Sequence, residues 1–316
     1  MKILANDGID PLGKSMLEKA GFEVDTANIP QQELAGRLRA YDAITVRSAT
    51  TVRKDLIDAC PNLKLIGRGG VGMDNIDVEY ARERGIQVVN TPASSSVSVA
   101  ELVFAHLLGG IRFLYDSNRL MPSEGDTAFN ALKKKYSGGK ELLGATLGII
   151  GFGRIGHEVA RRAVAFGMNV LVHDVFPVLD TLSIQLGGQE LTVRISSVTL
   201  EELLSSSDYI TLHVPGQSGS VSLLNSAEIA KMKKGAGIIN TSRGGLVNEQ
   251  ALLEGLNSGN LSFAALDVFE DEPTPAQAIL RHERISLSPH IGAATQEAQE
   301  RIGEELAGLV IGFFKR

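Results

Sequence analysis

The stretch "TLGIIGFGRIGHEVARRAVAFGMNVLVHD", residues 146–174, predicts a strand, a glycine-rich turn, a helix and a second strand in direct succession. The turn places Gly151, Gly153 and Gly156 in the spacing G-x-G-x-x-G, which lets a chain turn tightly after a strand and approach a pyrophosphate. The helix that follows offers N–H groups and the positive end of its dipole. The second strand ends in Asp174, about 20 residues on, where such folds place the acid that binds the adenosine ribose. We therefore predict a dinucleotide site here.

Asp174 also bears on the choice of dinucleotide. A carboxylate accepts hydrogen bonds from both ribose hydroxyls and repels a 2′-phosphate. No Lys or Arg follows Asp174 until Arg194. The sequence therefore favours NAD over NADP, and the alternative is that Asp174 is only a solvated acid at a strand end.

A second stretch, "LIGRGGVG" at residues 65–72, has the same glycine spacing in different surroundings. A dinucleotide loop must open a helix directly, because the helix supplies the N–H groups. Here the next helix begins only at about Asp77, and the next strand, "IQVVN", ends in Asn90 without an acid. Only the loop at residues 151–156 is therefore expected to bind the dinucleotide.

The first glycine loop needs a different role. Its N–H groups at residues 69–72 would form a nest suited to an anion, with Arg68 inside it. Arg47 and Ser48 end the neighbouring strand, "AITVRS", and α/β sheets bind ligands at the carboxyl ends of their parallel strands. We predict the substrate-carboxylate side here, and the alternative is that the glycines only make a tight turn.

Strand and helix patterns alternate along nearly the whole chain, which predicts parallel sheets with helices on both faces. The expected fold class is α/β with two doubly wound parallel-sheet domains. A flavodoxin-like substrate domain would span residues 1–95 and 292–316, and a Rossmann-type NAD domain residues 96–291. One long helix is expected over residues 97–118. The NAD domain should then hold strands near "TLGII", "NVLVHD", "LTVRIS", "DYITLHV", "GAGIINT", "FAALDV" and "RISLSP".

Composition excludes several classes of function. The net charge of −6 argues against a nucleic-acid or anionic-membrane surface. Cys60 is the one cysteine, so no internal disulfide can form, and no metal site is expected. The amino terminus lacks the apolar core of a signal peptide, and Glu101, His106 and Arg112 interrupt the most apolar run, residues 97–114. We expect a cytoplasmic protein without membrane or nucleic-acid partners.

A nicotinamide enzyme needs a group that moves the substrate proton while the cofactor moves the hydride. Among the histidines, His290 stands out in "SPHIGAAT", where it follows a strand and small residues let a flat ring approach. His173 and His213 also end strands and remain alternatives for lining the crevice.

Two further polar residues follow neighbouring strands of the same sheet. Arg243 lies in "NTSRGG", where Gly244 and Gly245 are expected to leave open space, and a guanidinium there can clamp a 2-oxo acid with two parallel hydrogen bonds. Glu272 lies in "DVFEDEP", and a carboxylate beside an imidazole holds one tautomer. We therefore predict a catalytic site of Arg243, Glu272 and His290.

Several segments together carry a family resemblance over nearly the whole chain. They are "VRSATTV", "LIGRGGVGMDNID", "VNTP", "SVAEL", "LGIIGFGRIG", "NTSRGGLVNE", "ALDVFEDEP" and "SPHIGAAT". They resemble the D-isomer-specific 2-hydroxyacid dehydrogenases, and are most similar to the members that act on D-3-phosphoglycerate. The resemblance implies that His290 is the acid/base, Glu272 its partner and Arg243 the substrate anchor. It also implies an active site in an interdomain cleft and a homodimer built on the nucleotide domains.

The resemblance further implies two sets of binding residues. The expected NAD contacts are Val71, Gly151, Gly153, Arg154, Ile155, Gly156, Asp174, His213, Val214, Pro215, Thr241, Ser242, Arg243, Asp267, His290, Gly292 and Ala293. The expected substrate contacts are Arg47, Ser48, Arg68, Gly70, Val71, Arg243 and His290.

The activity implied by the resemblance is the NAD-dependent oxidation of D-3-phosphoglycerate to 3-phosphohydroxypyruvate, the entry to serine synthesis. The phosphate would need cations such as Arg47, Arg68 or the run Lys133–Lys135, which is otherwise a solvated loop. Reduction of hydroxypyruvate or glyoxylate by the same residues is the nearest alternative. A NAD-sensing binding protein, similar to corepressors of this family, is an alternative of another class, and the intact triad weighs against it.

The sequence departs from the family pattern at two places that concern cofactor contacts. Ser95 stands where the family often has asparagine, and "LHVPGQSGSVSLLN", residues 212–225, lacks the usual threonines after the proline. The chain ends at Arg316, so we expect no serine-binding regulatory domain of the kind that larger family members carry.

Overall fold

The computed structural model describes residues 1–216 and 221–315 of the chain. Two compact units can be distinguished, Met1–Ser98 with Ala293–Arg316 and Val99–Gly292. We refer to these as unit 1 and unit 2.

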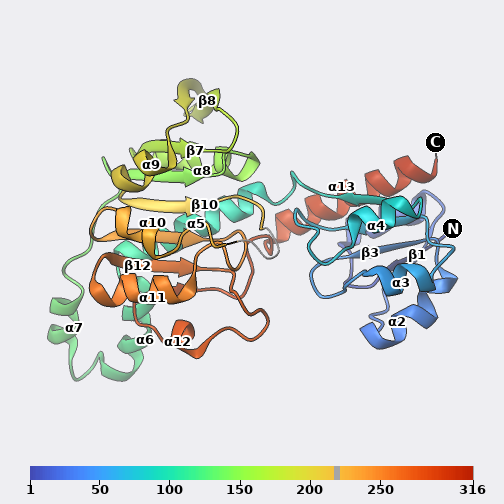
Figure 1. Ribbon diagram of the computed structural model, residues 1–316, viewed down its shortest axis with the longest axis horizontal. Coiled ribbons are helices and arrows are strands. Elements are labelled where there is room, and N and C mark those ends of the chain that lie inside the picture. Colours follow the sequence, from blue (N-terminus) through green and yellow to red (C-terminus); the bar gives the residue numbers. More distant parts are fainter. Residues whose placement is uncertain (217–220, 316) are drawn as a thin grey trace. The chain divides into compact units, whose positions relative to one another are not determined.

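Unit 1 is built on a parallel sheet of five strands (Figure 1). The strands are β1 Lys2–Ala5, β2 Glu23–Asp25, β3 Ala43–Val46, β4 Leu65–Arg68 and β5 Gln87–Asn90. Their order in space is β2-β1-β3-β4-β5, which is the order of a flavodoxin-like sheet. The predicted flavodoxin-like class is therefore confirmed for this unit.

Helices cover both faces of this sheet. They are α1 Pro11–Lys19, α2 Gln31–Arg37, a 3₁₀ turn Leu38–Ala40, α3 Lys54–Ala59, α4 Val78–Glu83 and α13 Gln296–Phe314. Because successive strand residues point to opposite faces, Ile3 packs with α1 and α13, whereas the next residue, Leu4, packs with α2 and its neighbours. Helices α1 and α13 approach closely at Gly13, whose missing Cβ would lie 2.5 Å from the carbonyl oxygen of Gly303.

Unit 2 is built on a second parallel sheet, with six strands (Figure 1). The strands are β6 Thr146–Ile150, β7 Asn169–His173, β10 Tyr209–Leu212, β11 Ala236–Asn240, β12 Leu261–Leu266 and β13 Ile285–Leu287. Their order is β13-β12-β11-β10-β6-β7. From β6 the sheet grows in one direction through β7 and in the opposite direction through β10, so the order of strands reverses between β6 and β10. The crevice at such a switch point is where doubly wound sheets bind dinucleotides. The predicted Rossmann-type class is confirmed here.

Helices pack on both faces of the second sheet as well. They are α5 Ser96–Ile111, α8 Arg154–Ala165, α9 Leu200–Ser206, α10 Ser226–Lys231, α11 Glu249–Ser258 and α12 Gln277–Leu280. Leu107 of α5 and Val159 of α8 share one core with Ile149 of β6. Helices α9, α10 and α11 share the other core, which contains Ile210 of β10.

One strand predicted for this sheet lies elsewhere. The segment "LTVRIS" belongs to β9 Gln189–Ser196, which pairs antiparallel with β8 Leu179–Leu186 in a separate hairpin. Gly187 and Gly188 form its two-residue turn and both have positive φ, 55° and 81°, as a type I′ turn requires. The prediction was wrong because the alternation of apolar and polar residues marks a strand but not its partner, whereas the Gly187–Gly188 turn pairs this strand with β8.

The long helix predicted over residues 97–118 is also interrupted. Helix α5 ends at Ile111, and α6 Leu114–Glu124 begins after Phe113, which has a left-handed φ of 56°. Within the described residues no single helix is long and apolar enough to cross a membrane; α5 and α6 meet that test only as a pair bent by 58°.

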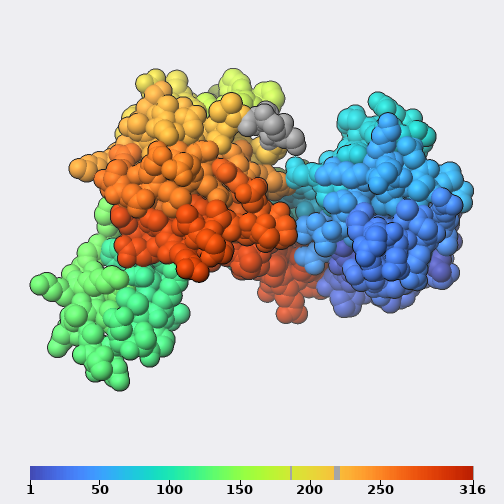
Figure 2. All heavy atoms as spheres, turned by 60° about the horizontal axis from the view of Figure 1, so that its bottom comes forward, coloured from blue at the N-terminus to red at the C-terminus, as the bar shows by residue number. Residues whose placement is uncertain are grey.

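Helix α6 and the following α7, Phe129–Lys135, form a lobe that projects from the rest of unit 2 (Figure 2). Lys135, one of the three lysines considered for phosphate binding, pairs with Asp116 of α6 at 3.0 Å. Asp116 also accepts a hydrogen bond from the hydroxyl of Tyr136. This lysine therefore links α7 to α6 within the lobe.

Candidate active site

The glycine loop after β6 has the geometry that a pyrophosphate needs. Gly151 has φ of 94°, and its missing Cβ would lie 2.5 Å from the carbonyl oxygen of His213. Gly156 packs equally closely on Gly151, whereas a Cβ at Gly153 would meet open space. Gly153 is the N-cap of α8, and no side chain caps this helix. The N–H groups of the first turn of α8 can therefore be approached by the pyrophosphate that the motif predicts.

Asp174 follows β7 and is fixed against this loop. Its Oδ2 accepts a hydrogen bond from the N–H of Phe152 at 2.7 Å, and its Oδ1 accepts one from the N–H of Phe176 at 3.2 Å. The carboxylate is therefore oriented before any ligand arrives, next to the site expected for the adenosine ribose.

Two polar residues follow β10 and β11, at the same edge of the sheet: the half-buried His213, whose Nδ1 atom is buried, and the buried Thr241. Among the described residues, the Nδ1 atom of His213 and the Oγ1 atom of Thr241 have no hydrogen-bond partner. Burial lowers the pKa of His213 to about 3, so its ring is neutral at physiological pH. Unpaired buried polar groups are rare, and at a dinucleotide crevice they fit a polar ligand. These residues and the glycine loop together fit NAD.

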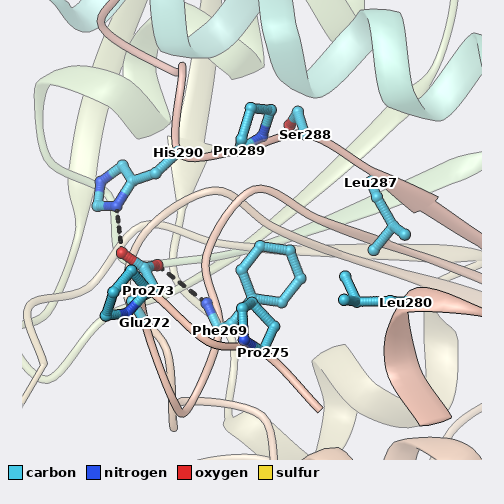
Figure 3. Close-up of a pocket in the computed structure, with 9 residues that line it drawn as sticks. All are labelled: Phe269, Glu272, Pro273, Pro275, Leu280, Leu287, Ser288, Pro289 and His290. Atoms are coloured by element: carbon cyan, nitrogen blue, oxygen red, sulfur yellow. Dashed lines mark hydrogen bonds and ion pairs between the residues drawn. The ribbon is translucent and has the colours of Figure 1, made fainter. Parts of the chain in front are cut away.

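His290 and Glu272 form a direct pair (Figure 3). The Nδ1 atom of His290 lies 2.8 Å from Oε2 of Glu272, and Oε1 of Glu272 accepts a hydrogen bond from the N–H of Phe269 at 3.0 Å. Both carboxylate oxygens are therefore held. Because Nδ1 donates to the carboxylate, Nε2 is the ring atom left to exchange a proton with a substrate.

The backbone of His290 is held in an uncommon conformation. Its φ is 55°, in the left-handed region, which costs a non-glycine residue about 1–2 kcal/mol. The carboxylate of Asp267, which is fully buried, accepts hydrogen bonds from the N–H groups of Ile291 and Gly292, each at 2.8 Å. Ser288 donates to the same carboxylate at 2.6 Å. Asp267 thus fixes the loop on both sides of His290.

Arg243 lies in a tight loop after β11. The amide of Asn240 donates to the carbonyl of Arg243 at 2.8 Å, and the Ser242 hydroxyl donates to the carbonyl of Leu212 at 2.6 Å. A Cβ at Gly245 would meet nothing within 4 Å, as expected. The expectation of open space was wrong at Gly244, because its missing Cβ would lie 1.7 Å from the carbonyl oxygen of Phe269. The glycine instead lets this loop pack on the loop that carries Glu272.

A pocket of about 410 Å³ adjoins the His290–Glu272 pair (Figure 3). Its other walls are Phe269, Pro273, Pro275, Leu280, Leu287, Ser288 and Pro289. Sequence reasoning missed Leu280 and Leu287, because an apolar residue in a helix or strand looks like any other core residue. Ser288 carried a weak signal, since it stands in the same short segment as His290.

The first glycine loop, in unit 1, uses part of its hydrogen-bonding capacity internally. The N–H of Gly69 donates to the carbonyl of Val46, and the N–H of Gly70 donates to the hydroxyl of Thr91 at 2.7 Å. Arg68 donates from Nη1 to the carbonyl of Gly69 at 3.0 Å. Two amides of the expected anion nest are thus engaged within unit 1.

Arg47 follows β3 and lines a hollow of about 290 Å³ in unit 1, together with Asp7, Gly69 and residues of α13. Its backbone is fixed, because its N–H donates to Asp7 at 2.6 Å and its carbonyl accepts from Asn75 at 2.8 Å. Ser48 is exposed beside it.

Most of the remaining predicted NAD contacts follow the same elements along the chain, whereas Val71 lies after β4 in unit 1. Arg154 and Ile155 begin α8, Val214 and Pro215 follow β10, Gly292 ends unit 2 and Ala293 begins the second segment of unit 1. Part of the segment that departs from the family pattern, residues 217–220, lies outside the described residues. Across the described ranges, no group of three or more His, Cys, Asp or Glu side chains is arranged to hold a metal ion.

The fold and this site define a nicotinamide-dependent dehydrogenase with two doubly wound domains. Residues 104–292 match the family model described as D-isomer specific 2-hydroxyacid dehydrogenase, NAD binding domain. The chain belongs to the D-isomer specific 2-hydroxyacid dehydrogenase family, and its cofactor is NAD.

Among known proteins, the chain is 43% identical to the hydroxypyruvate reductase of Thermotoga maritima over 305 residues, 94% of each chain. It is 41% identical to the D-3-phosphoglycerate dehydrogenase of Rattus norvegicus over 97% of this chain, but it spans only 55% of that protein. The TT0316 protein from Thermus thermophilus has a similar structure, with a TM-score of 0.86 and 32% identity over 99% of this chain and 97% of that one.

Proposed function

We propose that the chain oxidises D-3-phosphoglycerate to 3-phosphohydroxypyruvate, the first step of phosphorylated serine biosynthesis. The observation that carries the dehydrogenase chemistry is the 2.8 Å pair of His290 and Glu272, with Arg243 on the adjoining loop. The choice of substrate is supported by the arginines at the ends of β3 and β4 and by similarity to D-3-phosphoglycerate dehydrogenases.

The residues would act in the following way. Arg243 binds the carboxylate of the substrate and turns the C2 hydroxyl toward His290. Nε2 of His290 takes the hydroxyl proton, and Glu272 stabilises the charge that the ring gains. The glycine loop at residues 151–156 would hold NAD, which when bound would supply the acceptor for the hydride that leaves C2. In the reverse direction the same imidazolium returns the proton to the carbonyl oxygen.

Reduction of hydroxypyruvate or glyoxylate is the second candidate. It is favoured by the hydroxypyruvate reductase relative, which matches this chain over nearly its full length. This candidate needs no cation for a phosphate, and Arg68, one of the cations expected there, donates to the carbonyl of Gly69 in its own loop.

Steady-state rates with NADH would separate the two candidates. The substrates would be 3-phosphohydroxypyruvate, hydroxypyruvate and glyoxylate, compared at one pH and salt concentration. We expect the highest kcat/KM for 3-phosphohydroxypyruvate. A higher kcat/KM for either unphosphorylated substrate would assign the chain to the second candidate, and no turnover of any of them would favour a binding protein.

We also propose that the chain works as a homodimer. Leu114, Met121 and Phe129 are large apolar side chains exposed on the projecting α6–α7 lobe, where a second copy would cover them. Light scattering after size exclusion tests this. A monomer at micromolar concentration would contradict it, and Phe129→Asp should weaken the dimer.

A further inference from the structure

His106 lies inside unit 2 between two serines of the segment that leads to His290. Its Nδ1 atom is 2.8 Å from Oγ of Ser286, and its Nε2 atom is 2.8 Å from Oγ of Ser288. His106 belongs to α5, whereas Ser286 belongs to β13 and Ser288 is the residue that follows β13. All three side chains are buried. An imidazole of a helix is thus joined to the loop of the proposed acid/base.

The direction of each hydrogen bond in this network follows from chemistry. The ionised carboxylate of Asp267 can only accept, so Ser288 donates its hydroxyl proton there. The oxygen of Ser288 must then accept from Nε2–H of His106. In a neutral ring Nδ1 is left as an acceptor, and it receives the hydroxyl proton of Ser286. Burial lowers the pKa of His106 and outweighs the opposing effect of the Asp267 charge, which keeps the ring neutral.

The network ends at the backbone of His290. Asp267 accepts the N–H groups of Ile291 and Gly292, the two residues that follow His290. These bonds hold His290 in its left-handed conformation, with its ring directed at Glu272. Every bond from His106 to this pair lies within the described part of unit 2.

We propose that His106 is a positioning residue for the acid/base: its Nε2–H orients Ser288, Ser288 orients Asp267, and Asp267 fixes the backbone of His290. The inference rests on the proposed role of His290 as the group that moves the proton. The competing explanation is that His106 only satisfies buried polar groups of the core, and the two explanations predict different effects of substitution.

Three substitutions test the direction of the network. His106→Leu removes both hydrogen bonds, His106→Gln keeps a donor that can reach Ser288, and Ser286→Ala is the matched control, which removes the bond on the side away from Asp267. We expect His106→Leu to lower kcat for 2-oxo acid reduction by about 10- to 100-fold, the loss typical of a slightly misplaced catalytic group. His106→Gln should recover most of that loss, and Ser286→Ala should keep kcat close to that of the unaltered protein.

Two further measurements separate positioning from folding. NADH affinity, followed by fluorescence in the absence of substrate, should change far less than kcat in all three variants, because most of the expected NAD contacts lie outside this network. Thermal melting reports the loss of stability. Equal losses of kcat in His106→Leu and Ser286→Ala would overturn the proposal, because a merely structural role predicts them. Unchanged kcat in a folded His106→Leu protein would overturn it as well.

A spectroscopic test does not depend on turnover or on the His106→Leu variant folding. In protein labelled with ¹⁵N-histidine, the ring signals that disappear in His106→Gln identify His106. We expect these signals to show the neutral Nε2–H tautomer from about pH 6 to pH 8, across the ordinary titration range of histidine. An Nδ1–H tautomer, or protonation within this range, would overturn the directed network. Failure of the proposed function instead would appear as normal turnover in His290→Ala, with the His106 signals unaffected.

Discussion

The missing Cβ of Gly244 would lie 1.7 Å from the carbonyl oxygen of Phe269. The loop that carries Arg243 and the loop that carries Glu272 are therefore packed backbone against backbone. Phe269 also donates its N–H to Oε1 of Glu272 at 3.0 Å. The contact at Gly244 thus holds the loop of Arg243, the proposed substrate anchor, against the loop of Glu272, the proposed partner of the acid/base.

Gly244→Ala should accordingly be damaging, because the added methyl group meets backbone atoms rather than a flexible side chain. We expect it to lower the free energy of unfolding by about 1–3 kcal/mol or more, the range for overpacked sites, and to reduce kcat through displacement of Glu272. Urea unfolding and steady-state kinetics measure both effects. Gly138→Ala is the matched control, since a Cβ there meets nothing within 4 Å. Similar behaviour of the two variants would contradict the packing argument.

His290→Ala should remove most turnover while leaving NADH binding nearly intact. General acid/base catalysis contributes about 10²–10⁴-fold, whereas His290 is only one of the many NAD contacts that the family resemblance implies. Glu272→Gln should also lower turnover, because an amide has one acceptor oxygen for two donors, the Phe269 N–H and the Nδ1–H of His290, and carries no charge to stabilise the protonated ring. Rates with saturating substrate and fluorescence titration of NADH check these outcomes. Near-normal turnover of His290→Ala would mean that another residue moves the proton.

Asp174→Ala should narrow the preference for NAD over NADP. The unaltered carboxylate, fixed by the N–H groups of Phe152 and Phe176, would face the 2′-phosphate of NADP and repel it. We therefore expect NADH to bind far more tightly than NADPH to the unaltered protein. Equal affinity of the two reduced cofactors, measured by fluorescence, would show that Asp174 does not lie at the ribose.

The sequence was sufficient to predict both parallel sheets. It was also sufficient to predict the strand, glycine loop and helix that begin at residue 146, and the acid, Asp174, that follows the next strand. Those features depend on contacts close in sequence, such as the glycine turn at residues 151–156 and the strand that ends before Asp174. The hairpin of β8 and β9 was not predicted because strand patterns do not specify partners. The network of His106 was out of reach, because it joins residues of α5 and β13 that only the folded sheet brings together.

Stability should fall in acid partly because of His213. Burial lowers its pKa in the folded state to about 3, whereas the unfolded chain has the ordinary value of about 6.5. Between these pH values the unfolded state binds more protons than the folded state. The contribution of neutral His213 to the stability of the folded protein is therefore complete above about pH 6.5 and is lost as the pH falls toward 3. Burial shifts the pKa of His106 in the same direction.

His213→Leu should therefore flatten the dependence of unfolding free energy on pH between about pH 6.5 and pH 4, by up to roughly 1.4 kcal/mol per pH unit. Urea denaturation at a series of pH values measures this slope. Thr211→Val is the control, because it removes the hydroxyl that lies 3.0 Å from Nε2 of His213 but leaves the titrating ring in place. An unchanged slope in His213→Leu would show that His213 does not control this part of the profile.

The phosphate of the proposed substrate, 3-phosphohydroxypyruvate, should need the cations of unit 1. Replacing Arg47 or Arg68 by Ala should raise KM for 3-phosphohydroxypyruvate more than KM for hydroxypyruvate, because the carboxylate and carbonyl are common to both. Loss of a charged contact at a partly exposed site costs about 1–3 kcal/mol, roughly 5- to 150-fold in affinity.

Arg68→Ala also removes the bond to the Gly69 carbonyl, and the hydroxypyruvate rates correct for any resulting change in the loop. Arg243→Lys is the control, since it should weaken the binding of 3-phosphohydroxypyruvate and of hydroxypyruvate to a similar extent. Equal losses for both substrates in Arg47→Ala and Arg68→Ala would show that these arginines hold the carboxylate or the fold, and reduction of an unphosphorylated 2-oxo acid would become the favoured function.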